Sequence, residues 1–237
     1  HPYINPKRAH ALVLDFIGGE PLLEIDLITE VMRYFRDKAI ELNHRWATQY
    51  VVTMTSNGML YDNPKVQSFL QENDGRAIIT ITIDGDKETH DKCRVTCDGC
   101  GSYDKAAHAF ASVKERFGHS GSKFTIAPAN VATAASACRH IIETFNLNAL
   151  HCNCVYEEGW NDELAAVLYW QLKEFADWLL ESGRWKDCYI SIFNPAHCHP
   201  LDEEHTQNWF GGTGKMLAFD IDGVCYPCIR YAPLSIG

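Results

Sequence analysis

The sequence predicts an α/β fold in which parallel strands alternate with helices as a partial TIM-like (β/α) barrel, followed by the start of a small hairpin segment. Two observations predict this fold. Apolar runs of strand length alternate with segments of helical apolar periodicity about six times along the 237 residues. Turn-forming residues, often glycine, follow most of these runs. This alternation is typical of a sheet with helices outside, as an open doubly wound sheet or a full or partial barrel.

The first half of the chain contains three predicted strands, at residues 11–17, 50–55 and 77–83. After the first strand, apolar residues recur on one helical face: Ile28, Val31, Met32, Phe35 and Ala39. A second helix is expected to begin at Pro64, because proline suits the first turn of a helix. A long polar loop is expected between the third strand and the next helix.

The second half continues the alternation with predicted strands at residues 123–127, 147–155 and 188–193. Periodic apolar residues predict two helices, one with Ala106, Phe110, Val113 and Phe117, the other with Ala134, Cys138, Ile141, Ile142 and Phe145. A longer helix is expected from residue 162 to 182, closed by Gly183. Its predicted buried residues are Leu164, Val167, Leu168, Leu172, Phe175, Leu179 and Leu180. Residues 216–228 predict a hairpin that turns at Asp222-Gly223.

Composition limits the class of protein. The chain has 21 Lys and Arg residues against 31 Asp and Glu residues, a formal net charge of −10, which argues against a broad nucleic-acid-binding face. No apolar run approaches the ~20 residues that a membrane helix needs. No signal peptide is recognisable, so we expect a cytoplasmic protein. The chain starts at His1 instead of Met, which indicates a processed, trimmed or fragmentary N-terminus.

Small and polar residues stand where the first three predicted strands end. They are Gly18, Gly19, Glu20 and Pro21 after the first strand, Ser56, Asn57 and Gly58 after the second, and Thr82, Asp84 and Gly85 at the third. Glycine lets a ligand approach the backbone closely, and a carboxylate accepts from an ammonium group. An amide and a hydroxyl suit a ribose. Each segment alone is more often a structural turn. Together, at neighbouring strand ends, they predict one ligand site.

These segments resemble motifs of the radical S-adenosylmethionine (SAM) enzymes. The GGEP sequence at residues 18–21 is similar to the family's first strand-end motif, and residues 55–58 are similar to the motif of the next strand. The stretch from Asp84-Gly85 through His90-Asp91 and Arg94 to residues 99–103 resembles a segment of the peptide-modifying branch. Residues 208–228 resemble the start of a SPASM domain, which binds auxiliary iron–sulfur clusters. The resemblance covers almost the whole chain and looks closest to maturases of ribosomally made peptides of the CXXX-repeat type.

The resemblance implies a radical SAM partial barrel over residues 1–194 and a truncated SPASM-like segment over residues 195–237. In this family a 4Fe–4S cluster held by three Cys binds SAM and, once reduced, cleaves it to a 5′-deoxyadenosyl radical that abstracts a hydrogen from the peptide. The implied partners are a precursor peptide and a reductant such as flavodoxin or ferredoxin, and no nucleic acid or membrane is expected. The chain would thus be a fragment of an oxidoreductase that matures peptides.

The resemblance also implies roles for single residues. Glu20 would bind the SAM amino group, Asn57 and Thr82 would lie near the ribose, and Arg94 would reach the SAM carboxylate. The end of the fifth strand, residues 151–155, would lie near the adenine. The full set of expected cofactor-binding residues is Gly18, Gly19, Glu20, Pro21, Ser56, Asn57, Thr82, Asp84, Arg94 and Asn153.

The expected ligands of the SAM cluster do not stand at their usual place. The family's Cys-x3-Cys-x2-Cys motif should precede Gly18, but the 17 residues before it contain no Cys. The first strand and the cluster loop are therefore expected to be missing, and we expect that the chain alone cannot cleave SAM. Cys93, Cys97 and Cys100 repeat the spacing at another position, where three nearby thiolates suit a cluster in principle but where chance spacing in a loop is favoured.

The tail departs from the family as well. Cys228 matches an auxiliary-cluster ligand, and Cys225 and Cys198 are further candidates. Phe210 stands where the family usually carries a Cys, and phenylalanine cannot ligate iron. An auxiliary iron–sulfur cluster would therefore need ligands from these three cysteines and from elsewhere.

Several alternatives remain open from the sequence. The chain could be a non-catalytic peptide-binding remnant of the fold, or a metal-dependent hydrolase on a similar barrel. Zinc could bind at Cys93, Cys97 and Cys100, or at His197-Cys198-His199, although lone histidines are more often structural. The chain has 10 cysteines, and those within apolar stretches, Cys138 and Cys188, are expected to fill the core.

Overall fold

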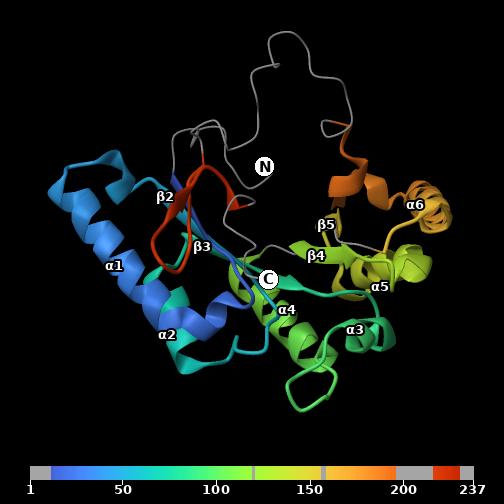
Figure 1. The fold of residues 1–237 in the computed structure, drawn as a ribbon, viewed down its shortest axis with the longest axis horizontal. Helices are drawn as coiled ribbons and strands as arrows, with labels where there is room; N and C mark the ends of the chain where they lie inside the picture. Colours follow the sequence, from blue (N-terminus) through green and yellow to red (C-terminus); the bar gives the residue numbers. More distant parts are fainter. Residues whose placement is uncertain (1–11, 119–120, 156–158, 196–215, 230–237) are drawn as a thin grey trace, which may run out of the picture. The chain divides into compact units, whose positions relative to one another are not determined.

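A computed structural model of the chain describes residues 12–118, 121–155, 159–195 and 216–229 (Figure 1). The chain divides into two compact units, His1–Phe193 and Asn194–Gly237. In the described residues, no helix is both long enough and apolar enough to cross a membrane.

Six parallel strands form the sheet of the first unit, in the order β1-β2-β3-β4-β5-β6. They are β1 (Leu12–Phe16), β2 (Tyr50–Ser56), β3 (Ala77–Thr82), β4 (Gly121–Ile126), β5 (Ala149–Cys154) and β6 (Tyr189–Ile190). Figure 1 shows the helices along the outer side of this sheet. The prediction of a partial TIM-like α/β fold is confirmed.

The α-helices of the described residues are α1 (Ile25–Glu41), α2 (Pro64–Glu72), α3 (Lys87–Cys93), α4 (Tyr103–Phe117), α5 (Ala134–Phe145) and α6 (Asp162–Ser182). Side-chain caps begin α2, α3 and α6. The Asn63 side chain accepts from the Lys65 amide ahead of α2, and Asn161 does the same from Leu164 ahead of α6. Gly183 ends α6 in the left-handed region with φ of 74°. The predicted start at Pro64 and the predicted bounds of α6 are confirmed.

Three sequence predictions about elements were wrong. The polar loop after the third strand contains α3, which apolar periodicity could not reveal because its only buried residue is His90. The sixth strand is only two residues long and continues as a 3-10 helix over Ser191–Phe193. Leu180 is 64% exposed, because the α6 residues that bury fully are Phe175 and Leu179, and the next residue points about 100° away.

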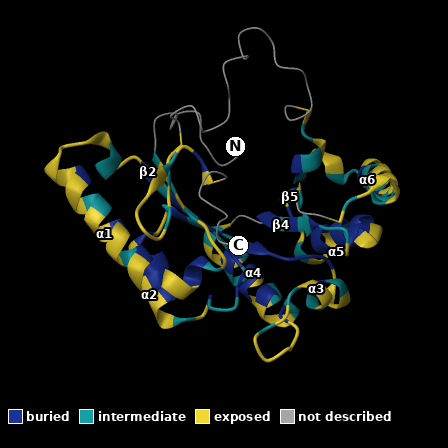
Figure 2. Ribbon diagram, viewed as in Figure 1, coloured by how far each residue is buried: buried dark blue, intermediate teal, exposed yellow. Residues whose placement is uncertain are grey.

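The core lies between the sheet and the helices. Along β2, β3 and β4, every second residue faces the helices and is almost completely buried, as for Val52, Met54, Ile79, Ile81, Phe124 and Ile126. Figure 2 shows this buried layer in dark blue and the outer faces of α1 and α6 largely exposed. The residues between them in sequence belong to the other face of the sheet, because side chains alternate along a strand. That face carries the candidate site.

The described part of the second unit is a hairpin. Strands β7 (Ala218–Phe219) and β8 (Cys225–Tyr226) pair antiparallel. The Asp220 carboxylate closes the turn by accepting from the Asp222 and Val224 amides at 3.0 and 2.9 Å and from the Tyr226 hydroxyl at 3.0 Å. Gly223 provides the positive φ of 78°. The predicted hairpin, with its turn at Asp222-Gly223, is confirmed.

Candidate functional site

The face of the sheet that turns away from the helices carries rows of polar side chains. Strand register aligns Asp15 with Thr53, and the Thr53 hydroxyl donates to the Asp15 carboxylate at 2.6 Å. Further along the sheet, Thr82 aligns with Lys123, and Lys123 aligns with His151. A buried sheet face that only filled space would be apolar, so these rows favour a ligand-binding face.

Glu20 joins the ends of β1 and β2 through its carboxylate. Its Oε1 accepts from the Leu22 amide at 3.1 Å and from the Ser56 hydroxyl at 2.8 Å, and its Oε2 accepts from the Asn57 amide at 2.7 Å. A carboxylate has about four acceptor positions. These contacts use three of them, so one position on Oε2 has no donor among the described residues. The carboxylate is half-buried and is the natural partner for a cationic donor.

Gly18 and Gly19 are exposed, and the protein's own packing does not require glycine at either position. Neither has a positive φ, and a Cβ built on either would meet no described atom within 4 Å. The backbone beside Glu20 is therefore open to close approach by another molecule. Pro21 follows as the first residue of a 3-10 helix (Pro21–Glu24), and Glu20 caps that helix.

The two ends of the Asn57 side-chain amide have different roles. Its Oδ1 accepts from the Met59 amide at 2.9 Å, which fixes the turn after β2. Its side-chain NH2 group donates to no described residue, so Asn57 offers a ligand two donors and the second acceptor position of Oδ1. Ser56 is buried, and its hydroxyl also accepts from the Gly58 amide at 3.0 Å.

Thr82 and Asn153 lie on the same face of the sheet. Thr82 is 5% exposed, and no described residue hydrogen-bonds its hydroxyl. Asn153 is exposed and aligns with Thr125 on β4. The structure thus brings Glu20, Ser56 and Asn57 into direct contact and places Thr82 and Asn153 on the same sheet face.

At the end of β3, four residues form a closed ring of hydrogen bonds. The Asp84 amide donates to His90 Nδ1 at 3.1 Å, and His90 Nε2 lies 3.0 Å from the Ser102 hydroxyl. That hydroxyl donates to the Arg94 carbonyl at 2.9 Å, and Arg94 Nε donates back to the Asp84 carboxylate at 2.5 Å. Because Nδ1 accepts, His90 is neutral with its proton on Nε2; burial lowers its pKa.

Asp84 is enclosed by the protein. Its other oxygen accepts from the Thr125 amide at 3.0 Å, and only 4% of its side chain is exposed. Arg94 is different, because its side chain is 32% exposed and only its Nε has a described partner. Its terminal nitrogens therefore remain available as donors, while Asp84 holds the guanidinium in place.

Two glycines of this segment, Gly85 and Gly101, are required by packing. Gly85 has φ of 96°, and an added Cβ would lie 2.9 Å from the Ala137 Cβ. A Cβ on Gly101 would lie 2.1 Å from Asp91 Cγ, and that carboxylate accepts from the Tyr103 amide at 2.8 Å. Residues 84–103 therefore form a closely packed structural segment around α3, which is called the frame below.

Sequence reasoning missed two polar residues near the strand ends. Lys123 lies on the polar face, and alternation with the buried Ser122 and Phe124 was the signal that could have identified it. Asn130 is buried and shapes the chain after β4: it accepts from the Ala127 amide at 2.7 Å and donates to the Thr125 carbonyl at 3.0 Å.

The described residues do not provide a ligand set for an iron–sulfur cluster. Across residues 12–118, 121–155, 159–195 and 216–229, no three His, Cys, Asp or Glu side chains are grouped as a metal site. Cys225 is exposed and Cys228 is buried, while Cys198 lies outside the described residues. The assignment of these three as auxiliary-cluster ligands stays a prediction.

The interior cysteines behave as core residues, as predicted. Cys138 and Cys188 are buried at 2% and 5% exposure. Burial raises the pKa of the Cys138 thiol and raises that of Cys188 to about 11. Both are therefore neutral thiols that fill space between the sheet and the helices.

Comparison with known proteins identifies the fold. No protein-family model and no curated protein matches the sequence. Among solved structures, native anSMEcpe with bound AdoMet and Kp18Cys peptide matches at a TM-score of 0.67 and 19% identity, over 93% of this chain and 61% of that one. The same protein with the Cp18Cys peptide gives 0.68 and 19%, over 94% and 62%. With AdoMet alone it gives 0.59 and 19%, over 76% and 49%.

These neighbours are anaerobic sulfatase-maturating enzymes, radical SAM enzymes of the SPASM type. This chain therefore shares the fold of these structures over most of its length. The chain spans less than two thirds of the length of each of these structures.

Proposed function

We propose that the chain is the SAM-binding part of a radical SAM enzyme that matures ribosomally made peptides. The single observation that carries this proposal is the Glu20 carboxylate, which bridges β1 and β2 and keeps one acceptor position free. An ammonium group bonded there would complete the carboxylate's acceptors. SAM presents an ammonium group next to a carboxylate and a nucleoside, which is the combination that the surrounding residues fit.

The neighbouring residues supply complementary groups for the rest of SAM. Gly18 and Gly19 leave the backbone open beside Glu20. The Asn57 side-chain NH2 group and the Thr82 hydroxyl have no partner among the described residues and would bind the ribose. The terminal nitrogens of Arg94 are the donors for the SAM carboxylate, and Asp84 positions them without touching the ligand.

Further residues extend this proposed site. Asn153 and Lys123 lie on the same polar face and extend the site toward the adenine and the peptide. Ser56 holds the Glu20 carboxylate in position, and Pro21 opens the 3-10 helix that Glu20 caps.

The proposal for the whole protein includes the partners that the resemblance implies. We assign residues 1–194 to the radical SAM barrel and residues 195–237 to a SPASM-like segment. A precursor peptide is the proposed substrate, supported by the peptides bound to the structural neighbours. A flavodoxin or ferredoxin is the proposed reductant and the cytoplasm the proposed location.

In radical SAM enzymes, a reduced 4Fe–4S cluster supplies the electron that cleaves SAM to the 5′-deoxyadenosyl radical. The described residues offer no ligand set for such a cluster, so our proposal for this chain concerns binding. A non-catalytic peptide-binding remnant of the fold is the second candidate, because the described residues offer no ligand set for the cluster. Supplied anaerobically with iron, sulfide and a reductant, the 237-residue chain should release no 5′-deoxyadenosine. Its release, abolished by replacing Cys93, Cys97 or Cys100, would contradict this expectation.

Calorimetric titration of SAM into the chain tests the binding proposal. Glu20→Gln should weaken binding by about 10- to 100-fold, because a hydrogen bond to a charged group contributes roughly 1.5–3 kcal/mol. The matched control is Glu24→Gln, since Glu24 is exposed and its side chain does not cap α1. Equal binding by both variants, or no binding by the unsubstituted chain, would contradict the proposal.

A further inference from the structure

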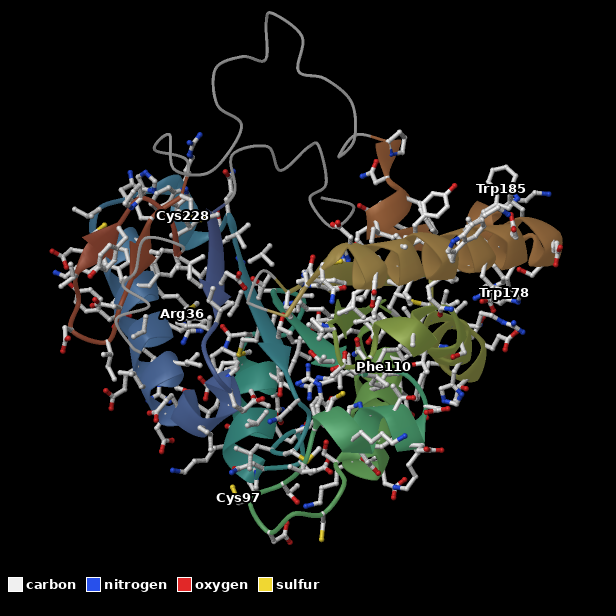
Figure 3. All side chains as sticks on the ribbon, turned by 45° about the vertical axis from the view of Figure 1, so that its right-hand side comes forward. Arg36, Cys97, Phe110, Trp178, Trp185 and Cys228 are labelled. Carbon is white, nitrogen blue, oxygen red and sulfur yellow. The ribbon has the colours of Figure 1, made fainter. Side chains whose placement is uncertain are left out.

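The loop between α3 and α4 carries three cysteines that the proposed function does not use. Cys93 is the last residue of α3, and Cys97 and Cys100 follow in the loop; all three are exposed. Figure 3 shows Cys97 on the green loop that projects from the lower side of the molecule. Exposed thiols are the accessible candidates for redox chemistry, whereas burial raises the pKa of Cys138 and Cys188 and keeps them unreactive.

The loop is a tight hairpin with a defined backbone. Val95 and Gly101 form an antiparallel bridge, and the Thr96 amide donates to the Cys100 carbonyl at 2.8 Å. Inside it, the Gly99 amide donates to the Thr96 carbonyl at 2.8 Å, and Gly99 has φ of 80°. These bonds are those of a three-residue hairpin loop, a β-turn followed by a left-handed glycine.

This backbone places two of the cysteines on either side of the reversal. Cys97 is the first central residue of the turn, and Cys100 follows Gly99 on the returning strand. The two ends of the β-turn, here Thr96 and Gly99, lie within about 7 Å between Cα atoms, and Cys97 and Cys100 each follow one of them. Disulfides span Cα separations of about 4.4–6.8 Å, which two residues on either side of so tight a reversal can reach. The Thr96 hydroxyl, which donates to the Asp98 carboxylate and lies 2.9 Å from the Cys100 carbonyl, further fixes the loop.

A metal site is the less favoured use of these thiols. Cys93, Cys97 and Cys100 are not grouped as a metal site, and no described His, Asp or Glu completes one with them. A disulfide needs only two of the three cysteines and no further ligand. The hairpin contains both Cys97 and Cys100.

We propose that Cys97 and Cys100 form a reversible disulfide by exchange with a small-molecule disulfide such as oxidised glutathione. One protein thiolate attacks a sulfur of the small disulfide, which gives a mixed disulfide and releases one thiol. The second thiolate then attacks the protein sulfur of the mixed disulfide and releases the second thiol. Two electrons pass from the pair to the small disulfide, and the two protons of the cysteine thiols pass through solvent to the two small thiolates, which gives two small thiols. The new bond lies within the loop between Arg94 and Ser102. Both of these residues belong to the ring of hydrogen bonds at the end of β3.

Peptide mapping tests this proposal on the complete chain. Trypsin cleaves after Arg94 and Lys105, and the resulting peptide, residues 95–105, contains Cys97 and Cys100 and no other cysteine. The reduced chain is equilibrated with ~0.1 mM oxidised glutathione, quenched with acid, alkylated and digested without reductant. The peptide lighter by two hydrogen atoms should exceed the glutathione adduct by about tenfold, because the second thiol's effective concentration is millimolar or higher.

Two variants separate this pair from its neighbour. Cys93→Ser should leave the peptide pattern unchanged, because Cys93 takes no part in the bond. Cys100→Ser should give only the glutathione adduct on Cys97. The proposal is overturned if the peptide carries glutathione on both cysteines, remains fully alkylated, or is linked to the peptide that contains Cys93.

Discussion

The end of β3 and the ends of β1 and β2 contain similar residue types in opposite roles. Both regions combine a carboxylate with glycines. At β3, the Asp84 side chain is only 4% exposed, and Gly85 packs against Ala137. At β1, Glu20 is half-buried with one acceptor position that no described donor uses, and an added Cβ at Gly19 would meet no described atom. A strand-end motif can therefore build a frame or leave a site open, and the burial of the carboxylate and the space around the glycine distinguish the two.

The largest expected effect comes from a glycine in the frame. Gly85→Ala should lower the free energy of unfolding by about 3 kcal/mol, because alanine at φ of 96° is strained and its Cβ would lie 2.9 Å from the Ala137 Cβ. Urea denaturation measures the change. A loss below about 0.5 kcal/mol would contradict the claim that packing requires glycine at this position.

The next largest effect on stability is expected at Asp84, the carboxylate of the frame. Asp84→Asn removes the ion pair with Arg94 and should cost about 2 kcal/mol, less than for a fully buried pair because Arg94 is partly exposed. Asp104→Asn is the control, because Asp104 is 79% exposed and pairs with Lys87 at the surface. Equal stability of the two variants in urea would count against the ring as a structural element.

His90 should make stability depend on pH. Burial lowers its pKa below the ordinary value of 6.5, so below that pH the unfolded chain binds a proton that the folded chain does not. Stability from this group is present at higher pH and falls as pH drops through 6.5, with a slope of up to about 1.4 kcal/mol per unit.

Urea denaturation at several pH values tests this expectation. In His90→Gln this contribution should disappear, whereas the exposed control His108→Gln should keep it. An unchanged slope in His90→Gln would show that His90 is not buried as a neutral group.

The sequence could predict the strands and helices better than the frame. The apolar periodicity of α5 and α6 and the strand-end glycines identified most of the fold, since burial of one face dictates those patterns. The ring around α3 could not be predicted, because one of its bonds uses the Asp84 backbone amide and depends on the path of the loop. Similarly, the sequence could not show that a local turn occupies one of the two acceptor positions of Asn57 Oδ1.

The smallest expected stability effect is at the open site. Gly19→Ala should change the free energy of unfolding by less than about 0.5 kcal/mol, because no described atom lies near the added methyl group and φ is not positive. The same substitution should weaken SAM binding, because the methyl group enters the open space beside Glu20. A large loss of stability would place Gly19 in the frame and remove the contrast with Gly85.

The most direct test compares two ligands on two proteins. SAM and 5′-methylthioadenosine share the nucleoside, but only SAM carries the ammonium group. We predict that Glu20→Gln weakens SAM binding by about 10- to 100-fold and leaves 5′-methylthioadenosine binding unchanged, since only SAM makes a charge-assisted bond to Glu20. Equal losses for the two ligands would contradict the assignment of Glu20 as the partner of the SAM ammonium group.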